Sequence, residues 1–269
     1  ALRSKLALCA GDMEYAQRLT SGMLQSLDPE HQPQLYEGVT AFSCWLSLYS
    51  NEIGRIRRWL ETAPDETVEF CTLNRYFYMV KIYCYAALGK HTDALMLISR
   101  MMVYADYAQR TYIRLECGLL RAIVMRRTGS DWKEDFLQVL SAISQYRFVP
   151  IISEKGAAIL PLLTEAKAAF CQRCPAAAAW FNQVLDRTMH MARLYPNYLK
   201  GTGIDVSAFS DTALEVLRLQ AAGYTTREIA QQLHITQRTV KYHASENYRK
   251  LDARNLVDAV QIAQSLHIL

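Results

Sequence analysis

The chain has 269 residues, of which 51% are hydrophobic and 21% charged, and a formal net charge of +4. This composition excludes a disordered chain and suits one large or two modest domains with a buried core. No apolar run reaches the roughly 18 uncharged residues of a membrane span, and no signal peptide opens the chain, so we expect a cytoplasmic protein without a membrane partner.

Seven cysteines are spread over segments with a helical pattern. The odd number indicates a reducing compartment. Cys171 and Cys174 form a lone CxxC pair, for which plain packing is favoured over a metal or redox site. We expect no cofactor. Because the chain starts at Ala1 inside a helical pattern, we interpret it as part of a longer protein or one whose start was removed.

An internal repeat occupies the first three quarters of the chain. Prolines and glycines are few and no segment shows the period-two alternation of strands, which predicts an all-α protein. An apolar helix end, a turn residue and a second amphipathic helix recur in LALCAGDMEYAQRL, LSLYSNEIGRIRRWL and CYAALGKHTDALMLI. Gly11, Asn51 and Gly89 are the turn residues, followed five positions later by Ala16, Ile56 and Ala94 and eight positions later by Leu19, Trp59 and Leu97.

Weaker copies of the pattern occur at Gly129 and near Cys174, so about five helical hairpins are predicted over residues 1–195. Such hairpins cannot bury a face alone and stack into an α-solenoid. Their spacing resembles tetratricopeptide-like repeats, although it is longer than the usual length of about 34 residues. Because the last two copies are loose, a non-repetitive helical bundle remains an alternative.

One aromatic helix in this region is a candidate for ligand binding. RYFYMVKIYCYA places Tyr76 and Tyr83 on one stripe and Tyr78 and Tyr85 on a neighbouring stripe. One stripe must face the core, and the other could line a groove for a small-molecule or protein effector. Aromatic stripes with this spacing are also typical of simple packing. The candidate ligand-binding residues are Arg75, Tyr76, Tyr83, Tyr112 and Arg114.

A domain joint follows the last hairpin. The stretch LYPNYLKGTGIDVSA contains one proline and two glycines and has no helical period. We therefore predict a linker over residues 196–208 and a separate domain over residues 209–269.

Helix-start signals divide this last domain into four predicted helices. The second begins with a full capping box, TTRE, formed by Thr225 and Glu228. A three-residue turn, HIT, joins the second helix to the third, which is helix-turn-helix geometry. The predicted capping residues are Ser210, Thr225, Thr236 and Asn255, and the helices run to about Ala222, Leu233, Leu251 and Leu266.

This domain resembles the DNA-binding domain of the LuxR/NarL family of bacterial transcription regulators. The stretches EVLRLQAAGYTTREIAQQL, TVKYH and RKL carry the likeness, which extends from Phe209 to about Leu266. The order of repeats and LuxR domain is similar to the carboxy-terminal part of the large regulators typified by the maltose activator. In those proteins an ATP-binding domain precedes a helical-repeat effector domain, but the phosphate-binding pattern GxxxxGK[ST] is absent from this sequence.

The resemblance implies that the third helix of the domain enters the major groove of promoter DNA. Residues nearest the bases would include Lys241, which can donate to guanine, and the first turn of the helix would lie near phosphate. Arg249 and Lys250 could touch phosphate or simply be solvated. The DNA-binding candidates are Thr236, Gln237, Arg238, Thr239, Lys241, Tyr242, Ser245, Arg249 and Lys250.

Two positions depart from the family pattern. The family usually has a glutamate where Ala213 stands, and its loss removes a capping bond worth on the order of 1 kcal/mol. Asn247 stands in a position that is usually apolar, where an unbonded buried amide would cost roughly 1–3 kcal/mol. We expect Asn247 to bond to the backbone, or its helix to be rotated slightly.

The fourth helix of the domain is the candidate dimer contact. In the family this helix often pairs two monomers on a near-palindromic site. Closure of the domain core is the alternative for its apolar residues, Val257, Val260, Ile262 and Leu266.

Together these features predict a transcription regulator that senses an effector and binds promoter DNA, with RNA polymerase as a further partner. No catalytic constellation has a recognisable spacing, so we do not expect an enzyme. The alternative function is an interaction scaffold whose last domain no longer binds DNA specifically.

Overall fold

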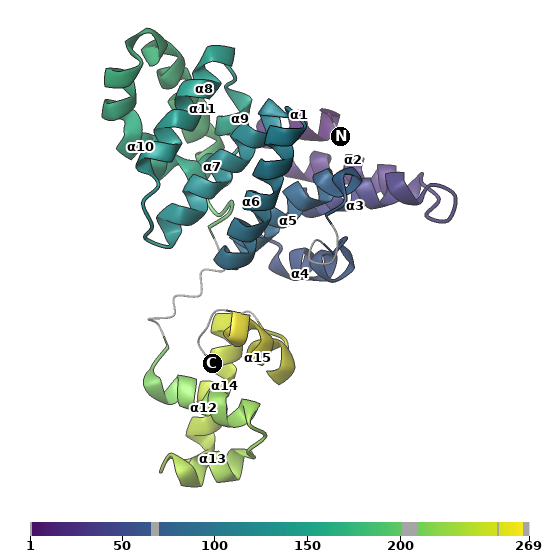
Figure 1. Cartoon of the computed structure of the whole chain (residues 1–269). Helices are drawn as coiled ribbons and strands as arrows, with labels where there is room; N and C mark the ends of the chain where they lie inside the picture. Colours follow the sequence, from purple (N-terminus) through teal and green to yellow (C-terminus); the bar gives the residue numbers. More distant parts are fainter. Residues whose placement is uncertain (1, 66–69, 201–208, 252, 266–268) are drawn as a thin grey trace. The chain divides into compact units, whose positions relative to one another are not determined.

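The computed structural model describes residues 2–65, 70–200, 209–251, 253–265 and 269. The chain divides into two compact units, Ala1–Gly201 and Thr202–Leu269, which we describe separately. All regular secondary structure in the described ranges is helical, which confirms the predicted all-α class (Figure 1).

In its described residues, the first unit forms five successive helical hairpins. From the second hairpin on, the first helix of each hairpin packs against the first helix of the next. Their assignment to a tetratricopeptide-like solenoid stays a prediction. The hairpins pair α1 (Leu2–Cys9) with α2 (Met13–Gln25), α3 (Pro33–Ser47) with α4 (Ile53–Thr62), α5 (Arg75–Ala87) with α6 (His91–Tyr107), α7 (Thr111–Arg127) with α8 (Lys133–Tyr146), and α10 (Gly156–Arg173) with α11 (Ala178–Leu194). Short helices η1 (Thr72–Asn74), α9 (Pro150–Ser153) and η2 (Pro175–Ala177) complete the unit.

The predicted turn residues reverse the chain in the left-handed backbone region. Their φ angles are 86° at Gly11, 56° at Asn51, 74° at Gly89 and 72° at Gly129. Glycine reaches this region without strain, and asparagine does so more easily than other residues. These four predicted turns are therefore confirmed. The residues five positions after the first three turns, Ala16, Ile56 and Ala94, are each at most 1% exposed.

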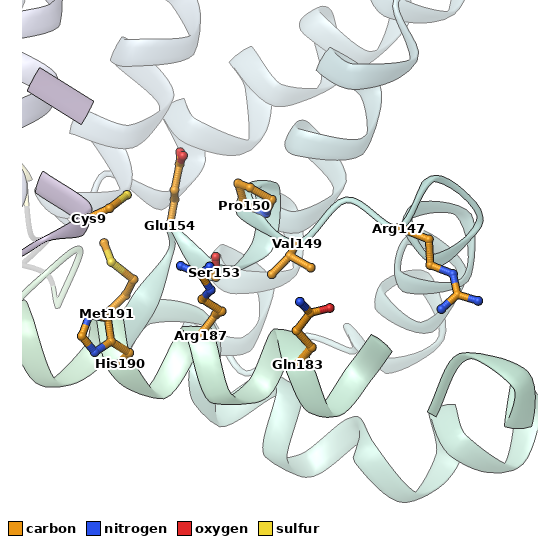
Figure 2. Close-up of a pocket in the computed structure, with 10 residues that line it drawn as sticks. All are labelled: Cys9, Arg147, Val149, Pro150, Ser153, Glu154, Gln183, Arg187, His190 and Met191. Atoms are coloured by element: carbon orange, nitrogen blue, oxygen red, sulfur yellow. The ribbon is translucent and has the colours of Figure 1, made fainter. Parts of the chain in front are cut away.

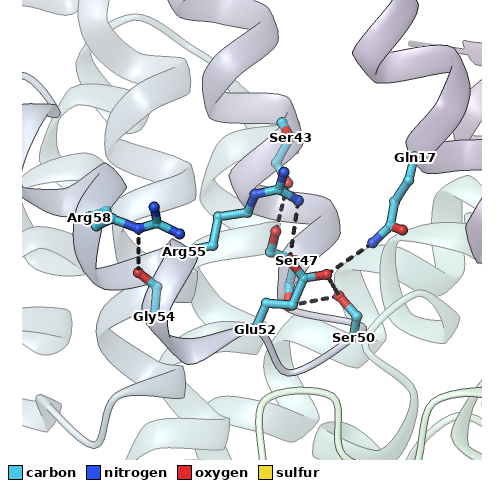
Figure 3. A network of polar contacts seen from close by, with 8 residues as sticks. All are labelled: Gln17, Ser43, Ser47, Ser50, Glu52, Gly54, Arg55 and Arg58. Atoms are coloured by element: carbon cyan, nitrogen blue, oxygen red, sulfur yellow. Dashed lines mark hydrogen bonds and ion pairs between the residues drawn. The ribbon is translucent and has the colours of Figure 1, made fainter. Parts of the chain in front are cut away.

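The carboxylate of Glu52 forms a polar bridge between the first two hairpins (Figure 3). Glu52, directly before α4, accepts a 3.0 Å hydrogen bond from Nε2 of Gln17 in α2 and a 2.6 Å bond from Ser50. Its second oxygen accepts a 3.1 Å bond from Arg55. Since these groups are largely solvated, the network orients the turn more than it stabilises the fold.

The segment after α11 closes the first unit. The hydroxyl of Tyr195 donates a 2.8 Å hydrogen bond to the carbonyl of Leu8, and the ring of Tyr198 stacks on that of Tyr49 with centroids 4.1 Å apart. Tyr198 and Leu199 are each 1% exposed. The predicted linker is therefore wrong over these residues, which belong to the first unit because their apolar side chains are buried in its core. Residues 201–208 of that linker lie outside the described residues.

The second unit contains α12 (Asp211–Ala221), α13 (Thr226–Gln232), α14 (Gln237–Leu251) and α15 (Leu256–Ser265). α14 packs against the other three helices. The predicted end at Leu266 lies outside the described residues.

All four predicted caps of the second unit are confirmed. Thr225 and Glu228 form the full capping box, in which Oε2 of Glu228 accepts a 2.8 Å bond from the Thr225 amide. Side-chain oxygens of Ser210, Thr236 and Asn255 accept backbone N–H groups at 3.2, 3.1 and 2.9 Å.

Candidate nucleic-acid interface and ligand pocket

The turn between α13 and α14 sets the start of the candidate recognition helix. His234 adopts a left-handed φ of 52°, and the amide of Ile235 bonds to the carbonyl of Ala230 at 3.0 Å. Ile235 packs beside the buried cluster that holds α13 against α14. The cap at Thr236 then starts α14, so local sequence signals determine where this helix begins.

One face of α14 is exposed while the opposite face is buried. Val240 and Leu251 are at most 1% exposed, whereas Tyr242 is 62% exposed. Spacings of three and four residues bring the exposed side chains onto one face. Of the nine predicted residues, seven are exposed, Thr236, Gln237, Arg238, Lys241, Tyr242, Ser245 and Arg249, and two are half-buried, Thr239 and Lys250.

The cations of this face differ in their contacts. Arg249 makes a bidentate pair with Glu246, with bonds of 3.0 and 2.8 Å, and this pair holds the pKa of the Glu246 carboxyl below its ordinary value. Nζ of Lys250 lies 5.2 Å from the ring centroid of Phe209. Lys241, in the amino-terminal half of the helix, is exposed. The amino-terminal half of α14 therefore offers the more available positive charge.

A family comparison covers this unit. Residues 207–263 match the family described as "Bacterial regulatory proteins, luxR family". The second unit contains a luxR-family domain. The match lies over the four helices with the predicted caps, and the resemblance inferred from the sequence is confirmed for this unit.

Two curated relatives match part of the chain. This chain is 44% identical over 50 residues to "Uncharacterized transcriptional regulatory protein YvfU" of Bacillus subtilis, covering 19% of this chain and 25% of that protein. It is also 37% identical over 81 residues to "Response regulator RamR" of Streptomyces coelicolor, covering 30% and 36%. The matches thus span between a quarter and about a third of these relatives. No solved structure matches.

A cavity of about 370 Å³ lies in the first unit. Four of the five predicted ligand-binding residues line it, namely Arg75, Tyr76, Tyr83 and Tyr112. Arg114 does not line it and instead pairs with Asp106. Tyr78, on the neighbouring aromatic stripe of α5, is completely buried in the core. We refer to this cavity as the aromatic pocket, since Phe42 and Trp45 also line it.

The repeat register contains a signal for two lining residues that the prediction omits. Lys5, Trp45 and Tyr83 each lie six positions before a turn residue, Gly11, Asn51 or Gly89, and all three line the aromatic pocket. Equivalent positions of successive hairpins thus meet at one cavity. Glu116 and Glu154 also line it, but no local pattern marks them.

A buried polar cluster forms part of the pocket wall. Oε1 of Glu116 accepts a 2.5 Å hydrogen bond from the hydroxyl of Tyr83 and lies 3.3 Å from Nζ of Lys155. Lys155 also donates to the carbonyl of Ile151 at 2.8 Å. Burial, with the nearby Glu116 charge, raises the pKa of Tyr83 well above its ordinary value, so this hydroxyl stays a donor.

A second hollow, of about 280 Å³, lies between α9 and α11 (Figure 2). Gln183, Arg187 and His190 line the hollow from α11, and Glu154 lines it from the side opposite α11. Glu154 lines both this hollow and the aromatic pocket. Glu154 is therefore shared by the linings of the two cavities.

Cys171 and Cys174, the two cysteines of the CxxC pair, are free and half-buried. In the described ranges, no cluster of three or more His, Cys, Asp or Glu side chains could hold a metal ion. None of the helices in the same ranges has both the length and the apolar character needed to cross a bilayer.

Proposed function

We propose that this chain is a DNA-binding transcription regulator, with α14 of the luxR-family domain as its recognition helix. The carrying observation is the exposed face of α14, on which Lys241 and Tyr242 project from a helix with a buried opposite side. A lysine can donate to the acceptor atoms of guanine, and the first turn of the helix suits a phosphate. Both curated relatives are named as regulators, which supports the same role.

Binding to genomic DNA fragments at two salt concentrations tests this proposal. The affinity should fall steeply with salt because phosphate contacts release counterions. Lys241→Ala should weaken binding, whereas Lys167→Ala, an exposed lysine of α10, serves as the matched control. Equal binding by wild type and Lys241→Ala, or no binding at low salt, would instead favour an interaction scaffold.

We further propose that the aromatic pocket of the first unit receives the effector. Its volume lies within the range of small-molecule sites, and its lining combines apolar rings with few charged groups. RNA polymerase would be a later partner, contacted once the regulator is on its promoter. In this role the protein is not an enzyme and acts in the cytoplasm.

A homodimer on DNA is supported by α15. Val257 is 67% exposed and Val260 is half-buried, so apolar surface remains outside the core, while Ile262 is 5% exposed and closes the core. Val257→Asp should reduce cooperative binding to a two-half-site fragment without weakening binding to a single half-site. Loss of binding to both fragments would indicate that Val257 is needed for folding of the domain and not for pairing of two monomers.

A further inference from the structure

The aromatic pocket already contains an ammonium group at its exposed side. Nζ of Lys5 lies 4.9 Å from the ring centroid of Trp45 and 3.8 Å from Oε2 of Glu154. An aromatic face and a carboxylate together attract a cation. The side chain of Lys5 is nevertheless 43% exposed, and 3.8 Å is beyond a good hydrogen bond. Lys5 is therefore held only loosely.

A second ammonium group contacts two lining residues from the protein interior, with the same kinds of partner. Nζ of Lys155 lies 5.5 Å from the ring centroid of Tyr83 and 3.3 Å from Glu116. In contrast to Lys5, its side chain is 2% exposed, and it also donates to Ile151. Lys155 is thus fixed in the interior beside Tyr83 and Glu116, and Lys5 is the cation that can leave.

We propose that the aromatic pocket binds an organic ammonium ion, which replaces the Lys5 ammonium at Trp45 and Glu154. This proposal rests on the proposed function of the pocket as an effector site. The exchange leaves the net charge beside Glu154 unchanged, because the ligand ammonium takes the place of the Lys5 ammonium. A ligand that entered without displacing Lys5 would meet a carboxylate that is already paired and would gain little from its charge.

Glu154 and the aromatic rings favour a cation over an anion. Glu116 is already bonded to Tyr83 and paired with Lys155, so Glu154 is the carboxylate whose negative charge can attract an ammonium ion, whether that ion carries N–H groups or is fully alkylated. Five aromatic rings line the pocket, and their faces carry negative potential. Arg75 adds a positive charge to the lining, so the favourable place for the ligand is where Trp45 and Glu154 already hold a cation.

Choline and its neutral isostere 3,3-dimethylbutan-1-ol are suitable probes, because they differ in charge at nearly constant shape. Calorimetry on the full chain should show choline binding at least about tenfold more tightly than the isostere. Lys5→Met should tighten choline binding by removing the competing cation. Lys133→Met is the matched control, since Nζ of Lys133 lies 6.0 Å from the ring of Trp132 outside the pocket. Glu154→Gln should remove the preference for choline.

Glu154→Gln is expected to fold, because the side chain contact it removes is the Lys5 pair, while the backbone carbonyl of Glu154 keeps its 3.0 Å bond from Tyr49. Choline binding that is detected only in Lys5→Met would also support the exchange. Equal affinity for choline and its isostere in both wild type and Lys5→Met would overturn the proposal.

Hydrogen exchange of α5 and α7 is measured with choline and with a panel of neutral and anionic fragments. It distinguishes failure of the proposed ligand class from failure of the proposed effector site. Protection by such a fragment, without protection by choline in either protein, would overturn the cation class and leave the effector pocket in place. If neither choline nor any fragment protected these helices, the effector role of the pocket would fall as well. DNA binding by α14 is measured independently through Lys241→Ala.

Discussion

Nδ2 of Asn247 donates a 2.7 Å hydrogen bond to the backbone carbonyl of Ala213, which connects α14 to α12. These are the two positions at which the sequence departs from the LuxR pattern. The prediction that Asn247 bonds to the backbone is confirmed. Asn247 is completely buried, and its Oδ1 atom has no hydrogen-bond partner in the described part of the chain. One half of the amide is therefore satisfied and the other is not.

This half-satisfied amide predicts different effects for two substitutions. Asn247→Ala should destabilise the luxR-family domain by roughly 1–3 kcal/mol, because it removes the bond and leaves space in the core. Asn247→Leu should stay within about 1 kcal/mol of wild type, since it also removes the unpaired oxygen and fills the space. Hydrogen exchange of α12 and α14 measures both. A loss with leucine as large as that with alanine would contradict the expectation.

Neutralising Glu246 is expected to strengthen binding to DNA. In Glu246→Gln the Arg249 guanidinium loses its bidentate partner and becomes available to phosphate. Affinity at low salt should rise, and the slope of log affinity against log salt should steepen by about one. Glu215→Gln is the control, because it frees Arg218 on α12 instead. Unchanged or weaker binding by Glu246→Gln would remove Arg249 from the interface.

The turn at Gly11 is expected to be more sensitive than the turn at Gly129. Alanine at either position meets left-handed strain of about 1–2 kcal/mol. A Cβ at Gly11 would also lie 2.9 Å from Cδ2 of Leu194, whereas nothing lies within 4 Å at Gly129. Gly11→Ala should therefore lose more stability. Urea unfolding followed by tryptophan fluorescence reports this unit, because all four tryptophans lie in it, at Trp45, Trp59, Trp132 and Trp180. Equal losses would argue against the contact between the first turn and α11.

The capping box of α13 predicts a dependence of stability on pH. Hydrogen bonds from the Thr225 amide and hydroxyl lower the pKa of Glu228 below its ordinary value. A carboxyl with a lowered folded-state pKa stabilises the fold fully above its unfolded-state pKa, and this contribution is lost as the pH falls through the folded-state pKa. Glu228→Gln cannot titrate, so the protection of α13 against hydrogen exchange should decline less with acid than in wild type. An unchanged decline would assign the acid sensitivity to other groups.

Local signals in the sequence account for much of the fold. The turns at Gly11, Asn51, Gly89 and Gly129 and the four caps of the second unit depend on backbone conformation and on neighbours within a few residues. Such features can be predicted because the interacting groups are close in sequence. The exposed face of α14 follows from helical periodicity for the same reason, while its role in DNA binding stays a prediction.

Long-range packing decided the remaining features. The first unit extends beyond the predicted linker boundary, because Tyr198 stacks on Tyr49 and Tyr195 bonds to Leu8. No local pattern in the sequence indicates this packing. A short segment with proline and polar residues is typical of a linker, and only the folded unit buries its aromatic side chains.

The aromatic pocket shows both influences. Its tyrosines at 76 and 83 follow from helix periodicity, and the repeat register aligns Trp45 with Tyr83. Glu116 and Glu154 reach the same cavity only because α7 and the end of α9 pack beside α5 and α1 in the folded unit. The sequence by itself determined the helices and the turns that join them. Tertiary structure decided which charges share a cavity, since charges far apart in the chain become neighbours only when the hairpins pack.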